Sequence, residues 1–332
     1  MKKILNYING ELVAPNADAW LDNPNPGTGE IYSLIPDSDA SDVDRAVSAA
    51  EQAKEAWAST PTKVRSRYML KIAEGIEQRL DEFALAETTD NGKPLWLSKS
   101  VDIPRAVSNF EFFATAILHE HSEAHQTDET AINYTYEKPV GIAGCISPWN
   151  LPIYLFTWKI APALAAGCCV IAKPSEVTPM TAYLLSEVCK DAGLPAGVLN
   201  IVHGLGPKVG QRIVEHPQIP AISFTGGTST GAHLARTAAP MFKKLSLELG
   251  GKNPNLIFAD CDFDDMLNTT VRSSFANQGQ ICLCGSRLYI ERPIYETFKE
   301  AFVARVKALK VGDPLADDTK TGAVVSKPHM EK

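Results

Sequence analysis

Short apolar segments alternate with helical patterns through the middle of the chain. The apolar segments predict strands, and the segments between them carry apolar residues at helical spacing. Strands are expected at 141–146, 169–172, 198–202 and 221–224, and helices at 153–166, 179–192 and 207–215. Short buried strands joined by helical crossovers form a parallel sheet that is covered on both faces. The pattern therefore predicts an α/β fold.

The residues before this region predict a small strand region followed by helices. Turn-rich segments lie at 8–11 and 23–30, and helices are expected from Ser41, from near Pro61 and over 102–118. Farther along, Ile132, Tyr134 and Tyr136 alternate with polar residues. This alternation predicts a strand with one covered face.

Length and charge restrict the class of protein. The 332 residues are enough for two domains, and the formal net charge is −7 without a basic run. This charge argues against a nucleic-acid partner and favours small molecules. Met1-Lys2-Lys3 looks like the start of a signal sequence, but the residues from Asn6 to Glu11 interrupt any apolar segment, and no other stretch is apolar for long enough to span a bilayer. A cytoplasmic protein is expected.

The cysteines indicate neither a disulfide framework nor a metal site. There are seven, an odd number, without regular spacing. The pairs Cys168-Cys169 and Cys282-Cys284 lack the spacing and the histidine partners of a zinc site. We expect no metal.

Glycines and charged residues follow the predicted strands, where parallel sheets bind ligands. The segments are SPWN (147–150), KPSE (173–176) and the residues 225–231. Gly204, Gly206 and Gly210 also lie between a strand and a helix, but their spacing has one residue too many for the usual dinucleotide fingerprint. Two interpretations of that segment stay open, a glycine-rich turn and a nucleotide-binding loop.

Two later segments carry residue types suited to covalent chemistry. Cys282 ends FANQGQIC (275–282), and Glu248 lies in LELGGK (247–252). A cysteine can attack an electrophilic carbon, and a carboxylate can activate the water that releases the product. A buried cysteine is often inert, and Cys284 provides a comparison. An unpaired Glu248 would be costly to bury between two leucines, which predicts a function or a partner for it.

Together with FTGGTSTG (224–231), these motifs, in this order, resemble the NAD(P)-dependent aldehyde dehydrogenase superfamily along essentially the whole chain. DIPR (102–105), residues 147–163 and residues 271–284 look most like the 2-aminomuconic and 2-hydroxymuconic semialdehyde dehydrogenases. The resemblance implies a Rossmann-like doubly wound parallel sheet and part of a second α/β domain. It places an NAD-binding domain at 1–120 and 140–249, an oligomerisation β-arm at 121–139 and a catalytic domain at 250–332.

The resemblance also implies a role for each site residue. Cys282 would be the nucleophile, Glu248 the base, and Asn150 the oxyanion donor together with the Cys282 amide, although Asn150 could instead cap the next helix. Arg105 and Trp158 would bind substrate, with Arg105 holding a carboxylate, although a helical arginine is more often a solvent-facing residue. The cofactor would be bound by Ile146, Ser147, Pro148, Trp149, Lys173, Ser175, Glu176, Gly206, Gly210, Phe224, Thr225, Gly226, Gly227, Gly231 and Leu249.

The implied cofactor is NAD. Lys173 and Glu176 would bind the adenosine ribose, and Glu176 would repel a 2′-phosphate, although both could simply be solvated charges. The pyrophosphate would lie at the helix start between Gly226 and Gly231, where free amides favour an anion. Gly227 stands where many relatives have serine. The implied partners are an aldehyde substrate and further copies of the chain, in a homodimer or homotetramer.

Two alternatives compete with hydrolytic aldehyde oxidation. In the acyl-CoA-forming branch of the superfamily the thioester passes to coenzyme A, but those relatives typically lack the glutamate found here as Glu248. The second alternative is an inactive fragment or a non-catalytic protein. Family members are usually much longer, and this sequence stops at Lys332 without their EIFGP-type motif. The chain would then be either inactive or a piece of a longer active enzyme.

Overall fold

A seven-stranded sheet forms the centre of the computed structural model, which describes residues 1–331. Five neighbouring strands are parallel, and a β-hairpin continues the sheet in antiparallel orientation. In spatial order the strands are β12 (Lys244–Leu249), β11 (Ala221–Gly226), β8 (Ile142–Ile146), β9 (Cys169–Lys173), β10 (Leu199–Ile201), β2 (Asn6–Ile8) and β3 (Glu11–Val13). The predicted parallel sheet is confirmed, and β12 is a strand that the pattern did not predict.

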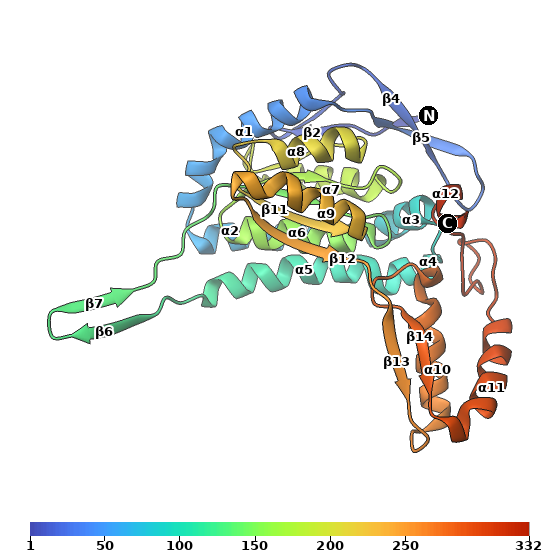
Figure 1. The fold of residues 1–332 in the computed structure, drawn as a ribbon. Coiled ribbons are helices and arrows are strands. Elements are labelled where there is room, and N and C mark those ends of the chain that lie inside the picture. Colours follow the sequence, from blue (N-terminus) through green and yellow to red (C-terminus); the bar gives the residue numbers. More distant parts are fainter. Residues whose placement is uncertain (332) are drawn as a thin grey trace.

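Helices cover both faces of this sheet (Figure 1). One face carries α1 (Ala40–Ser59), α8 (Gln211–Glu215) and α9 (Thr228–Ala238). The other face carries α6 (Pro152–Ala165) and α7 (Met180–Asp191), with α2 (Thr62–Gln78), α3 (Leu80–Asn91) and α5 (Ile103–Ala116) packed outside them. Strands β8, β9 and β10 are almost entirely buried between these layers, which explains their continuous apolar sequence.

Helix α3 was not predicted because its pattern is unusual. It buries Glu87, Thr88, Asp90 and Asn91, so its polar residues do not mark a solvent-facing side. It is followed by α4 (Leu95–Leu97) and by the π-helix Ser98–Asp102, which leads into α5. A second π-helix, Gly206–Gly210, occupies the first half of the helix predicted at 207–215. In this part of the chain, short 3-10 helices lie at Ile117–His119 and Ala239–Met241.

A two-stranded hairpin extends away from the body (Figure 1). It consists of β6 (Ala124–Asp128) and β7 (Ala131–Tyr134). The prediction that one face of this strand is covered is wrong for a single copy of the chain. Ile132, Tyr134 and Tyr136 are 72%, 75% and 71% exposed. The alternation is present, but the hairpin projects beyond the part of the chain that could pack against it.

The residues after β12 form a second projection from the body (Figure 1). Its core joins Ile257, Leu267 and Phe298. Its elements are β13 (Asn253–Ile257), α10 (Phe263–Phe275), the 3-10 turns Ala276–Gly279 and Arg292–Ile294, β14 (Gly285–Ile290) and α11 (Tyr295–Lys307). The chain then returns to the body, where it forms α12 (Lys327–Met330) (Figure 1). Strands β13 and β14 are parallel.

A three-stranded sheet of β1 (Lys2–Lys3), β5 (Ile31–Pro36) and β4 (Trp20–Pro24) borders the body. The turn predicted at 8–11 is present between β2 and β3, where Asn9 and Gly10 both have positive φ. Over residues 1–331, no helix is long and apolar enough to cross a membrane.

Candidate active site

The parallel strands end along one edge of the sheet and bring the predicted motifs together there. Strands β8, β9, β11 and β12 end at Ile146, Lys173, Gly226 and Leu249, and the Ser147 amide donates to the Lys173 carbonyl at 3.0 Å. Pro148 and Trp149 follow on a half-buried loop, where the Trp149 ring lies 4.3 Å from that of His329, centroid to centroid. Ligands bind at this edge in open α/β sheets.

A cavity of about 580 Å³ opens between this edge and the helices α8 and α9. We call it the α9 cavity. Five residues predicted for the cofactor line it: Ile146, Glu176, Gly206, Gly210 and Phe224. The sequence interpretation missed the other six lining residues: Pro207, Gln211, Ser229, Thr230, His233 and Leu234. Most of these belong to helices whose position relative to the strands only the fold reveals.

Lys173 and Glu176 form an ion pair at the rim of the α9 cavity, so they are not two solvated charges. The buried Lys173 ammonium donates to Glu176 Oε2 at 2.8 Å and to the Pro174 carbonyl at 2.9 Å. Burial acts to raise the pKa of Glu176, but the charge and the hydrogen bond of Lys173 outweigh it and lower the pKa. Glu176 is therefore held as a carboxylate that faces the cavity.

The glycines at this edge have two different roles. A side chain on Gly206 would meet nothing within 4 Å, and one on Gly210 would make only ordinary contacts. A side chain on Gly231 would instead meet Leu249 at 2.4 Å, and one on Gly226 would meet Phe224 at 2.5 Å. A side chain at Gly226 or Gly231 would therefore displace the side chain of Phe224 or Leu249.

The start of helix α9 fits the predicted anion position. Thr225 and Gly226 are half-buried at the end of β11, and the exposed Gly227 precedes the first turn of α9. The first amides of an α-helix have no partner within the helix, and its dipole favours negative charge there. The two serines predicted to bind the cofactor are less accessible to solvent. Ser147 is buried, and Ser175 Oγ accepts from the Val177 amide at 3.4 Å.

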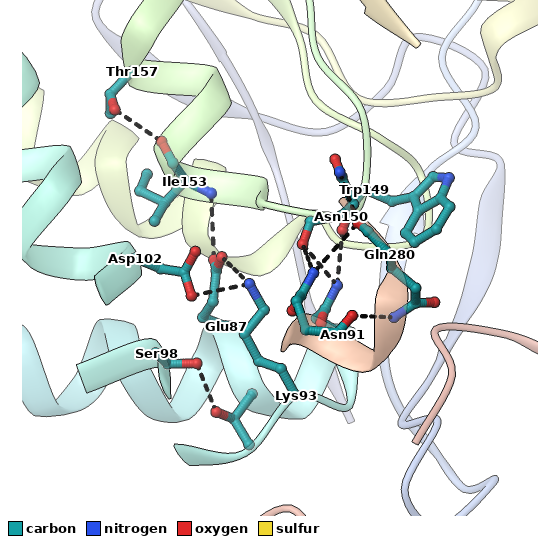
Figure 2. Close-up of polar contacts among 12 residues, drawn as sticks. Glu87, Asn91, Lys93, Ser98, Asp102, Trp149, Asn150, Ile153, Thr157 and Gln280 are labelled. Atoms are coloured by element: carbon teal, nitrogen blue, oxygen red, sulfur yellow. Dashed lines mark hydrogen bonds and ion pairs between the residues drawn. The ribbon is translucent and has the colours of Figure 1, made fainter. Parts of the chain in front are cut away.

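Asn150 connects two loops and does not cap the following helix. Its side-chain amide donates to the Gln280 carbonyl at 2.8 Å (Figure 2). The Asn277 side chain donates to the Asn150 carbonyl at 2.9 Å. Leu151 is the N-cap of α6, without a side-chain hydrogen bond. The capping alternative is therefore wrong, and Asn150 lies beside the loop that carries Cys282.

Cys282 differs from Cys284 in the way that its predicted role requires. Its side chain is exposed on a turn that follows the left-handed residues Asn277 and Gln278. Cys284 is partly buried, and burial raises the pKa of its thiol. The Asn253 side chain donates to the Cys282 carbonyl at 2.6 Å, which fixes the backbone of the turn. A reactive thiol must be accessible, and only Cys282 meets that condition clearly.

Glu248 is exposed, so the expectation of a costly burial is wrong. On β12 alternate residues face opposite sides, and Leu247 and Leu249 pack against the core while Glu248 faces away from it. Glu248 lines a cavity of about 440 Å³ with Trp158 and Lys159, which we call the β12 cavity. Within residues 1–331, Cys282 does not line that cavity.

Lys159 is a residue that the sequence interpretation missed. It is nearly buried in the β12 cavity, and its ammonium donates to Ser223 Oγ at 3.2 Å. Burial lowers its pKa, while the charges of Cys145 and Glu248 oppose that shift. The only signal in the sequence was a lysine inside an apolar helix.

Arg105 and Trp158 lie on neighbouring helices. The Arg105 guanidinium lies over the Tyr154 ring, 5.3 Å from its centroid, and Tyr154 packs edge-on against Trp158 at 6.4 Å. Arg105 is exposed on α5, and Trp158 is 45% exposed. An aromatic surface therefore joins the arginine to the β12 cavity.

Comparison with known proteins identifies the family. The family model described as "Aldehyde dehydrogenase family" matches residues 13–332. A protein named 2-aminomuconic semialdehyde dehydrogenase, from Homo sapiens, is 49% identical over 98% of this chain and 67% of its own length. A 2-hydroxymuconic semialdehyde dehydrogenase from Pseudomonas sp. (strain CF600) is 43% identical over 100% of this chain and 70% of its own.

The fold gives the same result. A solved NAD+ complex of an aldehyde dehydrogenase from Bacillus cereus superposes with a TM-score of 0.98 at 36% identity, covering 99% of this chain and 68% of that one. The predicted family resemblance and fold class are confirmed. The chain spans about two thirds of the length of these proteins. It belongs to the aldehyde dehydrogenase family.

Proposed function

We propose that this chain carries the nucleotide site and the reactive cysteine of an NAD-dependent enzyme that oxidises a carboxylate-bearing semialdehyde to the acid. The observation that carries the proposal is the contact between the Asn150 side chain and the loop that exposes Cys282. It connects a neutral amide donor to the loop that carries the only clearly accessible thiol among the described residues. That arrangement suits attack on a carbonyl carbon whose oxygen becomes negative.

The α9 cavity fits the adenosine half of NAD. Gly206 leaves open space, and the carboxylate of Glu176 can accept hydrogen bonds from ribose hydroxyls. The amides at the start of α9 can donate hydrogen bonds to a pyrophosphate. When bound, NAD supplies the hydride acceptor. The negative charge of Glu176 disfavours the 2′-phosphate of NADP.

The residues of this chain then divide the chemistry between them. The Cys282 thiolate bonds to the aldehyde carbon, and the amide of Asn150 and the Cys282 backbone amide donate to the resulting oxyanion. Loss of hydride leaves a thioester on Cys282. Glu248 takes a proton from water, the hydroxyl adds to the thioester carbon, and the sulfur leaves as the thiolate. An aldehyde, a water and NAD+ thus become a carboxylic acid, NADH and one proton.

The substrate class rests on Arg105 and on the relatives. Relatives that are 43% and 49% identical carry the names of dehydrogenases for muconic semialdehydes. Arg105, stacked on Tyr154 beside Trp158, can hold a remote carboxylate of the substrate. We therefore assign Arg105 and Trp158 to substrate binding.

The remaining assignments follow the same division of the chain. We propose that residues 1–120 and 140–249 bind NAD, that 250–332 belong to the catalytic domain, and that 121–139 join copies of the chain in a homodimer or homotetramer. The exposed apolar side chains of the hairpin support the last point. A cytoplasmic location is part of the proposal and is supported by the seven free cysteines.

A panel of aldehydes tests the proposed function. NADH formation should be fastest with semialdehydes that carry a carboxylate several bonds from the aldehyde, and mass spectrometry should find the free acid as product. Preference for uncharged long-chain aldehydes would contradict the substrate class. A coenzyme A thioester formed in the presence of coenzyme A would contradict hydrolysis.

A further inference from the structure

Three ionisable side chains form a cluster that the proposed chemistry does not use. Lys93 donates to Asp102 Oδ2 at 3.0 Å and lies 3.4 Å from Glu87 Oε1, and all three side chains have no exposed surface. Burial acts to raise the pKa of both carboxyl groups, and the charge of Lys93 opposes that shift. Buried charges are unfavourable unless they are paired, so a cluster of this kind calls for an explanation.

The cluster reaches the loop of Asn150 through one face of helix α3. Glu87 and Asn91 are four residues apart, and residues at that spacing lie on the same face of a helix. Glu87 Oε2 accepts from the Ile153 amide at 3.3 Å, and the Asn91 side chain donates to the Trp149 carbonyl at 2.9 Å (Figure 2). Asn91 also reaches the Asn150 carbonyl at 3.5 Å. The two contacts bracket Asn150.

Electrostatics favours this position for the cluster. Two acidic side chains share the single ammonium of Lys93. Ile153 is in the first turn of α6, where the helix dipole favours negative charge and the amides need an outside acceptor. Lys93 and Asp102 hold the Glu87 side chain in place. Glu87 can therefore accept a hydrogen bond from the buried amide of Ile153, which has no acceptor within α6.

We propose that Glu87 and Asn91 are positioning residues that fix the loop 149–153 and thereby aim the side chain of Asn150. The inference rests on the proposed function, in which Asn150 stabilises the oxyanion. Asn150 holds the Gln280 carbonyl at 2.8 Å, so a shift of its loop changes the geometry between its amide and Cys282. Misplacement by about 1 Å can lower a rate by about 100-fold.

Asn109 offers a matched control. It is also buried, and its side chain donates to the Tyr154 carbonyl at 3.0 Å and to Thr157 Oγ1 at 2.9 Å. It therefore binds the same helix α6, but only beyond the loop of Asn150. Asn109→Ala should disturb the packing of α6 about as much as Asn91→Ala without releasing the loop.

The experiment compares kcat, KM, Tm and hydrogen–deuterium exchange of the peptide 147–153 in the purified protein. Asn91→Ala should lower kcat about 10- to 100-fold with little change in KM for NAD, and should speed exchange of that peptide. Asn109→Ala should lower Tm similarly and leave both kcat and the exchange nearly unchanged. Glu87→Gln keeps an oxygen for the Ile153 amide, so it should lose less kcat than Glu87→Ala.

Equal effects of Asn91→Ala and Asn109→Ala on kcat and on exchange would overturn the positioning role, as would an unchanged exchange rate in Asn91→Ala. If the wild-type protein oxidises no aldehyde, the proposed function fails, and the exchange comparison alone decides whether the loop is fixed by α3. If Glu87→Ala does not fold, the Asn91 and Glu87→Gln variants carry the test.

Discussion

The side-chain amide of Asn150 donates to the main-chain carbonyl of Gln280 at 2.8 Å, and the two residues are 130 positions apart in the sequence. This hydrogen bond joins the edge of the central sheet to the loop of Cys282. An amide nitrogen carries two hydrogens, so one remains for a substrate oxygen. The contact therefore explains how a residue of the nucleotide-binding part can act at the cysteine.

Asn150→Ala removes both donors. We expect kcat to fall about 100- to 1000-fold, as when one donor of an oxyanion site is lost. NAD binding, followed by protein fluorescence, should change little because the α9 cavity does not include Asn150. A kcat within threefold of the wild-type value would remove Asn150 from the mechanism.

Glu248→Gln keeps the size of the side chain but removes the base. We expect a pre-steady-state burst of NADH followed by steady-state turnover at least ~100-fold slower, since hydride transfer precedes hydrolysis. Stopped-flow absorbance separates the two phases. Loss of the burst together with turnover would assign Glu248 an earlier step, such as activation of the thiol.

Glu176→Gln tests the choice of cofactor. The carboxylate repels a 2′-phosphate, so the variant should use NADP better relative to NAD than the wild-type protein does. Side-by-side kcat/KM values for the two cofactors measure the ratio. Glu74→Gln, on the exposed side of α2, is the control and should leave the ratio unchanged. A wild-type preference for NADP would contradict the role of Glu176.

Arg105→Ala tests the substrate class. A charge-assisted contact contributes about 1.5 to 3 kcal/mol, so kcat/KM for a carboxylated semialdehyde should fall by about 10- to 100-fold. An uncharged aldehyde of similar size should be nearly unaffected. Arg67→Ala, at an exposed position of α2, controls for the loss of a surface charge. The same loss with both aldehydes would show that Arg105 supports its helix and does not bind the substrate.

The central sheet could be predicted because its strands are buried on both faces and read as apolar runs. Strand β12 was not predicted because it is not a continuous apolar run. It lies at the edge of the sheet, where one face is open and Glu248 points outward. Helix α3 was not predicted because it buries polar residues, among them Glu87 and Asn91. Periodicity detects a contrast between polar and apolar sides, and helix α3 does not show one because it also buries polar residues.

The motifs located the site residues along the chain but not their contacts. The sequence places Glu176 after a strand, whereas its ion pair with Lys173 depends on the backbone of that turn. Glu87 and Asn91 left no signal at all, because their partners are main-chain groups about 60 residues away. Contacts to backbone carbonyls and amides do not depend on the identity of the partner residue, so a sequence pattern cannot reveal them.

The acyl-enzyme on Cys282 is the most direct test of the account. The protein is mixed with NAD and a carboxylated semialdehyde in the Glu248→Gln background, quenched with acid, digested and analysed by mass spectrometry. The account predicts the mass of the acyl group on Cys282, its absence in Cys282→Ala, and its persistence in Cys284→Ala, because a covalent adduct needs the accessible thiol. NADH formation without an adduct, or an adduct on Cys284, would contradict it.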